Sequence, residues 1–148
     1  MAVPLAVVGI LDLLSKRWVV ASFVIDERRT LVPHVIDLTY AANTHGAMGL
    51  FGDRPAVLVI LAVAVLGLLW VALYAALRHS AIAQIGFGFI AGGALGNVID
   101  RLVHGYVVDF ISVPHFYIFN LADAAIAVGL TFVAFPSLAG RRASKRAR

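Results

Sequence analysis

The sequence contains no cysteine, and only 14% of its 148 residues are charged. Without cysteine the chain cannot form a disulfide, present a thiolate nucleophile or hold a Cys-based zinc or iron–sulfur site. A hydrophobic share of 61% also leaves too few polar residues to coat a soluble domain of this size. The composition therefore predicts that lipid surrounds most of the chain.

Four apolar segments predict membrane-spanning helices. Residues 56–77 and 80–99 carry no charged residue, and each is long enough, at about 1.5 Å per residue, to cross a hydrocarbon core of roughly 30 Å. The first and last segments are apolar apart from Asp12, Lys16 and Arg17 in one and Asp123 in the other. The predicted fold is an all-α membrane protein, a four-transmembrane-helix bundle with helices at about residues 1–24, 55–77, 80–100 and 116–139.

The distribution of basic residues predicts the orientation of these helices. Arg78 lies in the turn between the second and third helices, and the tail at residues 141–148 falls on the same side if four helices alternate. Six of the twelve Lys and Arg residues are then on that side, with no Asp or Glu among them. The excess of positive charge makes that side cytoplasmic. We expect both termini to be cytoplasmic, a single integral-membrane domain over residues 1–140, and a basic cytoplasmic tail over residues 141–148.

Two outer segments, residues 25–54 and 101–115, connect the predicted helices. The first is rich in β-branched residues around positions 30–40, which predicts a small extended or β element at the outer interface. Small residues in the third helix, Gly92, Gly93 and Gly96, predict close approach of another backbone.

Ionisable groups at membrane depth are costly unless they are paired, hydrated or used in function. Asp12 and Lys16 are four residues apart on the first helix, hence on one face and within ion-pairing reach. Two interpretations stay open for them. They form a structural polar pair that fixes this helix to its neighbours, or they contact a substrate directly.

Further polar residues gather at the predicted outer ends of the third and fourth helices. Asn97 shares a helix face with Asp100 and Arg101, and Asn120 lies one turn before Asp123. If the outer segment folds back, Asp109 can meet Asp123 near the membrane surface. Two carboxylates that share one proton can act as acid and base towards a water, which is aspartyl-protease chemistry. The alternative is that each carboxylate has a separate partner.

No metal site is expected. None of the histidines lies in a His-Glu-x-x-His pattern or four residues from another histidine. The absence of cysteine removes the other common zinc ligand.

Three ordered motifs, together with the Asp-x-x-x-Lys of the first helix, carry a family resemblance. They are Gly-Asn-Val-Ile-Asp-Arg at 96–101, Val-Val-Asp-Phe at 107–110 and Phe-Asn-Leu-Ala-Asp at 119–123. In this order and spacing the chain resembles the lipoprotein signal peptidases, also called signal peptidase II or prolipoprotein signal peptidases. The resemblance runs from about Leu11 to Gly129.

The resemblance implies an aspartyl endopeptidase of the bacterial cytoplasmic membrane, with its active site at the extracytoplasmic face beside a small β-like cradle. It would remove signal peptides from diacylglyceryl-modified prolipoproteins by cutting before the lipidated cysteine. The family's catalytic residues match Asp109 and Asp123, and its substrate-binding residues match Asn43, Asn97, Asp100, Arg101 and Asn120. We expect no cofactor and no nucleic acid, a monomer, and as partners the lipid-modified substrate and membrane lipids. Arg101 would hold either the substrate backbone or an outer-leaflet polar group.

One motif departs from the family pattern, Asn43-Thr44-His45-Gly46-Ala47-Met48-Gly49. His45 stands where the family usually has Gly, and Met48 stands where it has Phe. A histidine reaches positive φ only at some cost, so either this loop differs in shape from that of the family or Gly46 takes the role of the usual glycine. The departure therefore bears on how the Asn43 side chain is oriented.

Two other functions are compatible with the sequence. A catalytically impaired homologue would act as a lipoprotein-binding scaffold, although both aspartates are retained. A small transporter or channel subunit would need a polar path through the full membrane depth. The uncharged second helix argues against such a path.

Overall fold

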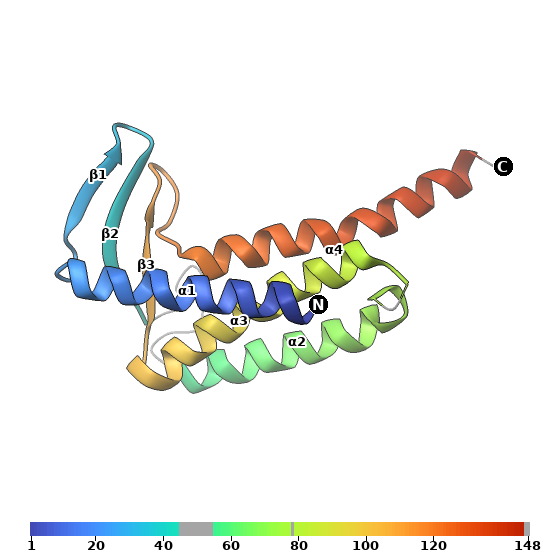
Figure 1. Cartoon of the computed structure of the whole chain (residues 1–148), viewed down its shortest axis with the longest axis horizontal. Coiled ribbons are helices and arrows are strands. Elements are labelled where there is room, and N and C mark those ends of the chain that lie inside the picture. Colours follow the sequence, from blue (N-terminus) through green and yellow to red (C-terminus); the bar gives the residue numbers. More distant parts are fainter. Residues whose placement is uncertain (45–54, 78, 147–148) are drawn as a thin grey trace.

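The computed structural model describes residues 1–44, 55–77 and 79–146. Within these ranges the chain forms four long helices and one three-stranded sheet (Figure 1). The elements in chain order are α1 (Ala2–Ser22), β1 (Arg28–Val32), β2 (Ile36–Asn43), α2 (Pro55–Leu77), α3 (Ala81–His104), β3 (Val107–Ser112) and α4 (Leu121–Arg146). The sheet stands at one end of the helices (Figure 1).

The first two helices have nearly the predicted bounds, and the other two differ. Helix α3 continues past the predicted end at residue 100 to His104, where Gly105 adopts a left-handed φ of 80° and donates its N–H to the Arg101 carbonyl at 3.1 Å. That geometry ends a helix without steric cost for glycine. Helix α4 begins at Leu121 rather than 116, because Phe119 instead bridges to Ile111 beside the sheet. It continues to Arg146 rather than ending at 139, so the predicted basic tail is helical for most of its length.

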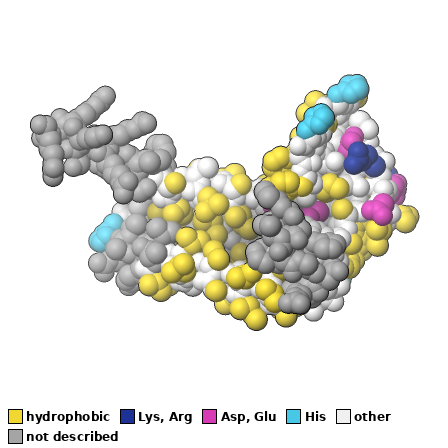
Figure 2. Space-filling model, turned by 180° about the vertical axis from the view of Figure 1, so that it is seen from behind, with side chains coloured by type: hydrophobic (Ala, Val, Ile, Leu, Met, Phe, Trp, Pro, Cys, Tyr) yellow, Lys and Arg dark blue, Asp and Glu magenta, His cyan; other side chains and the backbone are white. Residues whose placement is uncertain are grey.

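Apolar side chains cover the outside of the helical part. Exposed examples are Val3 and Ile10 on α1, Leu68 and Val71 on α2, and Leu102 on α3. Figure 2 shows hydrophobic side chains over the helices, whereas acidic and basic side chains gather near the sheet. Among the described residues, α3 is the one helix long and apolar enough to cross a membrane, and the apolar parts of α2 (Ala56–Val71) and α4 (Leu121–Ala134) are shorter. The four-span topology therefore stays a prediction.

The sheet is antiparallel with strand order β1-β2-β3. In the register of β2 with β3, Ala41 lies opposite Asp109 and Asn43 lies opposite Val107. Side chains two residues apart share one face of a strand, so Asn43 lies diagonally across from Asp109 on the same face. The β element predicted around residues 30–40 is confirmed, and β3 extends it.

A cluster of apolar side chains fixes the sheet against the end of α1. Val19 and Phe23 of this end pack with Tyr40, Val108 and Phe110 of the sheet, and all five are buried. Burying each large apolar side chain contributes about 1.5–3 kcal/mol. This contact holds β3, and Asp109 with it, against the bundle.

Helix α3 is central and contacts α1, α2 and α4. Its glycines lie against neighbouring backbones: Gly92 faces α1 at Leu5, and Gly93 faces the Ala122 carbonyl of α4. The predicted role of the small residues in close helix packing is confirmed. Gly86 and Gly129 form a further close crossing of α3 and α4.

We expect Gly86→Ala to destabilise the protein. A methyl group there would lie 2.7 Å from the Gly129 carbonyl oxygen and 2.7 Å from the Phe132 Cβ, and overpacking of this kind costs about 1–3 kcal/mol. Gly67→Ala in α2 is the matched control, because its methyl group would have nothing within 4 Å. Thermal unfolding in detergent should show a lower Tm for the first variant alone, and equal Tm values would contradict the close crossing.

Candidate active site

Asp109 lies in the middle of β3 and is 2% exposed. Its carboxylate accepts two hydrogen bonds from side-chain amides. Asn43 Nδ2 donates to Oδ2 at 2.7 Å, and Asn120 Nδ2 donates to Oδ1 at 2.7 Å. The β2–β3 register supplies the first donor, and the residue just before α4 supplies the second.

Asp123 lies in the first turn of α4, where it forms a capping box with Asn120. Asn120 Oδ1 accepts the Asp123 N–H at 2.9 Å, and Asp123 Oδ2 accepts the Asn120 N–H at 3.3 Å. Such reciprocal bonds satisfy N–H groups that have no partner within the helix. The other oxygen, Oδ1, accepts from Asn97 Nδ2 of α3 at 2.8 Å.

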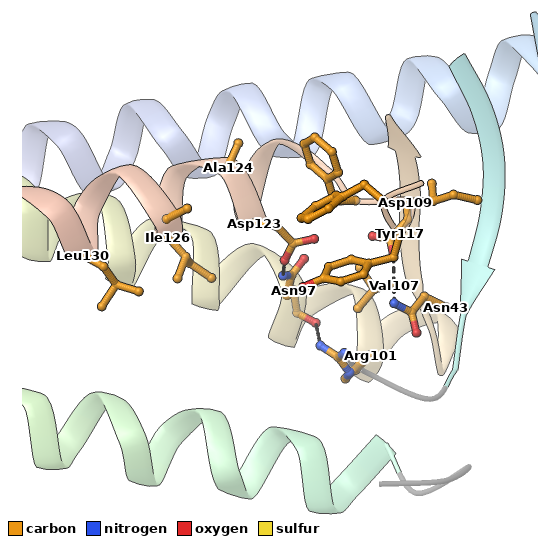
Figure 3. A pocket seen from close by; sticks show the side chains of 14 residues that line it. Asn43, Asn97, Arg101, Val107, Asp109, Tyr117, Asp123, Ala124, Ile126 and Leu130 are labelled. Atoms are coloured by element: carbon orange, nitrogen blue, oxygen red, sulfur yellow. Dashed lines mark hydrogen bonds between the residues drawn. The ribbon is translucent and has the colours of Figure 1, made fainter. Parts of the chain in front are cut away.

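Two amides link the carboxylates to each other. Asn120 Nδ2 donates to Asn97 Oδ1 at 3.1 Å as well as to Asp109. The structure thus brings together five predicted residues: Asn43 of β2, Asn97 of α3, Asp109 of β3, Asn120 just before α4 and Asp123 of α4. Both carboxylates border one cavity (Figure 3).

Asp12, Lys16 and Asp100 form a second cluster behind Asn97. The Lys16 ammonium lies 2.7 Å from Asp12 Oδ2 and 2.9 Å from Asp100 Oδ2. Asp12 also accepts the Ala122 N–H at 3.0 Å, and Asp100 accepts the Val108 N–H at 3.2 Å. The predicted ion pair of Asp12 and Lys16 is confirmed. Asp100 lies in this buried cluster and not on the wall of the cavity, so its predicted contact with substrate stays untested.

The cavity has a volume of about 530 Å³, with a polar end and an apolar end. The polar end contains Asn43, Asn97, Arg101, Asp109 and Asp123. The apolar wall follows α4 away from Asp123 through Ala124, Ile126, Ala127 and Leu130 (Figure 3). The site is therefore shaped for a molecule that is polar at one end and apolar at the other.

Arg101 brings a positive charge to the polar end. Its Nη1 donates to the Asn97 carbonyl at 3.2 Å. Its Nε is buried and has no hydrogen-bond partner among the residues that the structure describes. Arg101 also lines the cavity, where a guanidinium can donate to a carbonyl oxygen or to an anionic oxygen of a ligand.

Three aromatic side chains of the wall were missed at the level of sequence. Phe116, Tyr117 and Phe119 line the cavity, and the rings of Phe116 and Tyr117 stack at 4.4 Å. The sequence instead predicts these residues at the start of the last helix. The sequence signal that could have identified them is the aromatic run directly before Asn120. In the structure a left-handed residue, His115 at φ 62°, precedes this run.

The pKa of Asp109 is raised from its ordinary value of 3.8 to about 7. Burial is the largest cause and the neighbouring charge of Asp123 adds to it, whereas the Asn43 and Asn120 hydrogen bonds and the charge of Lys16 act in the lowering direction. A carboxyl group with such a pKa can hold or release a proton near neutral pH. The described residues contain no group of three or more His, Asp or Glu side chains that could hold a metal. His45 and Met48 of the departing motif lie outside the described residues, whereas the Asn43 side chain points to Asp109.

The sequence model of the family "Signal peptidase (SPase) II" matches residues 5–139 of this chain. The chain belongs to the signal peptidase II family. The lipoprotein signal peptidase of Syntrophomonas wolfei is 39% identical over 141 residues, which cover 95% of this chain and 94% of the relative. The lipoprotein signal peptidase of Gloeothece citriformis is 41% identical over 146 residues, which cover 95% of this chain and 91% of the relative.

The fold is also similar to that of a solved structure. A bacterial membrane enzyme superposes with a TM-score of 0.84 and 26% sequence identity, over 92% of this chain and 85% of the other. The family match is wider at both ends than the predicted resemblance from Leu11 to Gly129. It covers all of α2 and α3, most of α1 and α4, and every predicted site residue of this signal peptidase II family member.

The raised pKa of Asp109 predicts how stability depends on pH. The folded protein keeps the proton up to about pH 7, whereas the unfolded chain loses it near 3.8. The stability contributed by that proton is present at low pH and is lost as pH rises through about 7. We expect Asp109→Asn to lose less of its free energy of unfolding between pH 5 and pH 8 than the wild type does, as measured by denaturant unfolding in detergent. Asp37→Asn, which removes another carboxyl group of the sheet, should keep the wild-type dependence, and an unchanged dependence in Asp109→Asn would contradict the assignment.

Proposed function

We propose that this chain is a membrane aspartyl endopeptidase that removes signal peptides from diacylglyceryl-modified prolipoproteins by cutting before the lipidated cysteine. The observation that carries the proposal is the joint placement of Asp109 and Asp123. Two carboxylates held by shared asparagines border one cavity that is polar at their end and apolar along α4. Membership of the signal peptidase II family supports the same activity.

In the proposed reaction Asp123 acts as the base and Asp109 as the acid. A water bound between them gives a proton to Asp123 and forms a bond to the scissile carbonyl carbon, while Asp109 donates its proton to the carbonyl oxygen. The tetrahedral intermediate then breaks its C–N bond, and the leaving nitrogen takes the proton from Asp123 as the new carboxyl group returns one to Asp109. The raised pKa of Asp109, about 7, supports its starting role as the acid.

The cavity supports a substrate that carries both peptide and lipid. Arg101 lines the polar end of the cavity, and we assign its guanidinium to a carbonyl of the substrate backbone. Asn43 and Asn97 lie beside it at the polar end. The apolar wall from Ala124 to Leu130 suits a hydrocarbon chain of the diacylglyceryl group. We assign Asn120 to the positioning of both aspartates, since it is fully buried and donates to Asp109.

The proposal includes the arrangement in the membrane. The four helices span the bilayer as one domain over residues 1–140, both termini are cytoplasmic, and the protein is a monomer. The sheet and the aspartates then lie at the extracytoplasmic face, where a translocated lipoprotein precursor presents its cleavage site. Acidic and basic side chains near the sheet and apolar ones over the helices support the placement of the sheet at a membrane surface (Figure 2). The Lys and Arg residues at position 78 and in the tail support the cytoplasmic side for the opposite end.

Loss of either aspartate should abolish cleavage. We expect Asp109→Asn and Asp123→Asn each to lower kcat by about a hundredfold or more, because proton transfer by a placed group contributes about 10²–10⁴ in rate. Asp37→Asn is the matched control, since this carboxylate pairs with Arg28 at 3.6 Å on the other side of β2 from the site. The measurement is cleavage of a lipidated prolipoprotein in detergent. Near-normal turnover by either aspartate variant would remove that residue from the mechanism.

The absence of cysteine allows a direct test of the orientation. A Thr30→Cys variant should react with a membrane-impermeant maleimide in intact cells, because Thr30 is exposed on β1. A Ser144→Cys variant should react only after the membrane is permeabilised. The cysteine-free parent protein is the blank, and labelling of Ser144→Cys in intact cells would overturn the proposed topology.

A further inference from the structure

Lys16 is buried, at 3% side-chain exposure, and it does not line the cavity that contains the aspartates. Its ammonium contacts three acceptors: Asp12 Oδ2 at 2.7 Å, Asp100 Oδ2 at 2.9 Å and Asn97 Oδ1 at 3.0 Å. An ammonium has three N–H donors. All three are used within the protein, so Lys16 has none left for a substrate.

The contact with Asn97 decides which end of that amide faces the aspartates. Because an ammonium only donates, Asn97 turns its Oδ1 towards Lys16 and its Nδ2 towards Asp123, to whose Oδ1 it donates at 2.8 Å. The reversed amide would place two donors against each other at Lys16 and two acceptors against each other at Asp123. Lys16 therefore holds Asn97 in the orientation that Asp123 requires.

Asn120 connects the oriented Asn97 amide to Asp109. Its Oδ1 accepts the Asp123 N–H at 2.9 Å, so its Nδ2 is left to donate to Asn97 Oδ1 and to Asp109 Oδ1. Asn97 Oδ1 thus accepts from both Lys16 and Asn120. Each amide donates to one of the carboxylates through its Nδ2 and accepts through its Oδ1, and hydrogen bonds in such a chain polarise one another.

We infer that Lys16 is a positioning residue of the active site, which acts on Asp123 through Asn97 and does not touch the substrate. The inference rests on the proposed function of the two aspartates. A purely structural role is the competing explanation, because Asp12 and Asp100, which Lys16 neutralises, also anchor Ala122 of α4 and Val108 of β3. The two explanations differ in what happens to turnover when the charge balance is kept.

The first experiment separates kcat from KM in the Lys16→Met variant. We expect kcat to fall about a hundredfold, the scale for a small misplacement of a reacting group, and KM to stay within about twofold, since the substrate is not contacted. Arg17→Met is the matched control. Arg17 follows Lys16 on α1, is exposed and forms no ion pair among the described residues, so this variant should keep wild-type kinetics. A rise in KM at unchanged kcat would overturn the inference.

The second experiment keeps the net charge of the cluster. The double variant Lys16→Met with Asp12→Asn removes one positive and one negative charge, and the new amide oxygen can still accept the Ala122 N–H. We expect its Tm to return to near the wild-type value while kcat stays about a hundredfold low. Recovery of kcat together with Tm would show that Lys16 serves stability alone. A double variant that does not fold would also indicate that Lys16 serves stability. Either result would overturn the inference.

A double-mutant cycle tests the route through Asn97. If Lys16 acts through this amide, Lys16→Met should lower kcat by no more than about twofold in an Asn97→Leu background. A second, independent hundredfold loss would overturn the inference. Asp123→Asn is measured in the same assay. If that variant cleaves normally, the proposed function fails; if it is inactive while the Lys16 variants cleave normally, only the role of Lys16 fails.

Discussion

The ion cluster around Lys16 is the interaction on which the remaining structure depends. One ammonium from α1 meets Asp100 and Asn97 of α3, while its partner Asp12 reaches the first turn of α4 and Asp100 reaches β3. Breaking a buried pair by removing one partner costs about 3–5 kcal/mol, because the remaining charge is left without a partner. The approach of Asp12 to α3 is possible because residue 96 is glycine, where a Cβ would collide with the Asp12 carboxylate.

The charged groups of this region have two different roles. Those of the Lys16 cluster hold the structure together, and the two candidate catalytic carboxylates stay available for chemistry. Lys16, Asp12 and Asp100 form ion pairs with one another and fix the ends of three elements. Among the side chains that the structure describes, Asp109 and Asp123 receive hydrogen bonds from neutral amides alone. A carboxylate held by amides in a buried place keeps its capacity to bind a proton, as the raised pKa of Asp109 indicates. Asn97 and Asn120 lie between the Lys16 cluster and the two aspartates. They fix the position of the aspartates without neutralising the charge that the proposed chemistry uses.

The helices, the β element and the Asp12–Lys16 pair could be predicted from the sequence, because hydropathy, β-branched composition and i, i+4 spacing are local signals. The start of α4 could not. The run before Asn120 is apolar enough to continue a helix, yet Phe119 pairs with Ile111, and the capping box of Asn120 and Asp123 begins the helix later. The aromatic wall of the cavity follows from that same displaced boundary. The placement of Asp100 behind Asn97 depends on a lysine 84 residues away in sequence, for which no local pattern exists.

The sequence by itself predicted that lipid surrounds most of this chain and determined that Asp12 and Lys16 share one face of a helix. Its ordered motifs also pointed to the signal peptidase II family. Only the tertiary structure decided which polar residues face the cavity and which face one another. Motifs specify residue identities, whereas the direction of an amide or the burial of a carboxylate depends on neighbours from distant segments. Here those neighbours are Asn43 from β2 and Lys16 from α1, brought to the ends of α3 and α4 by helix crossing and strand register.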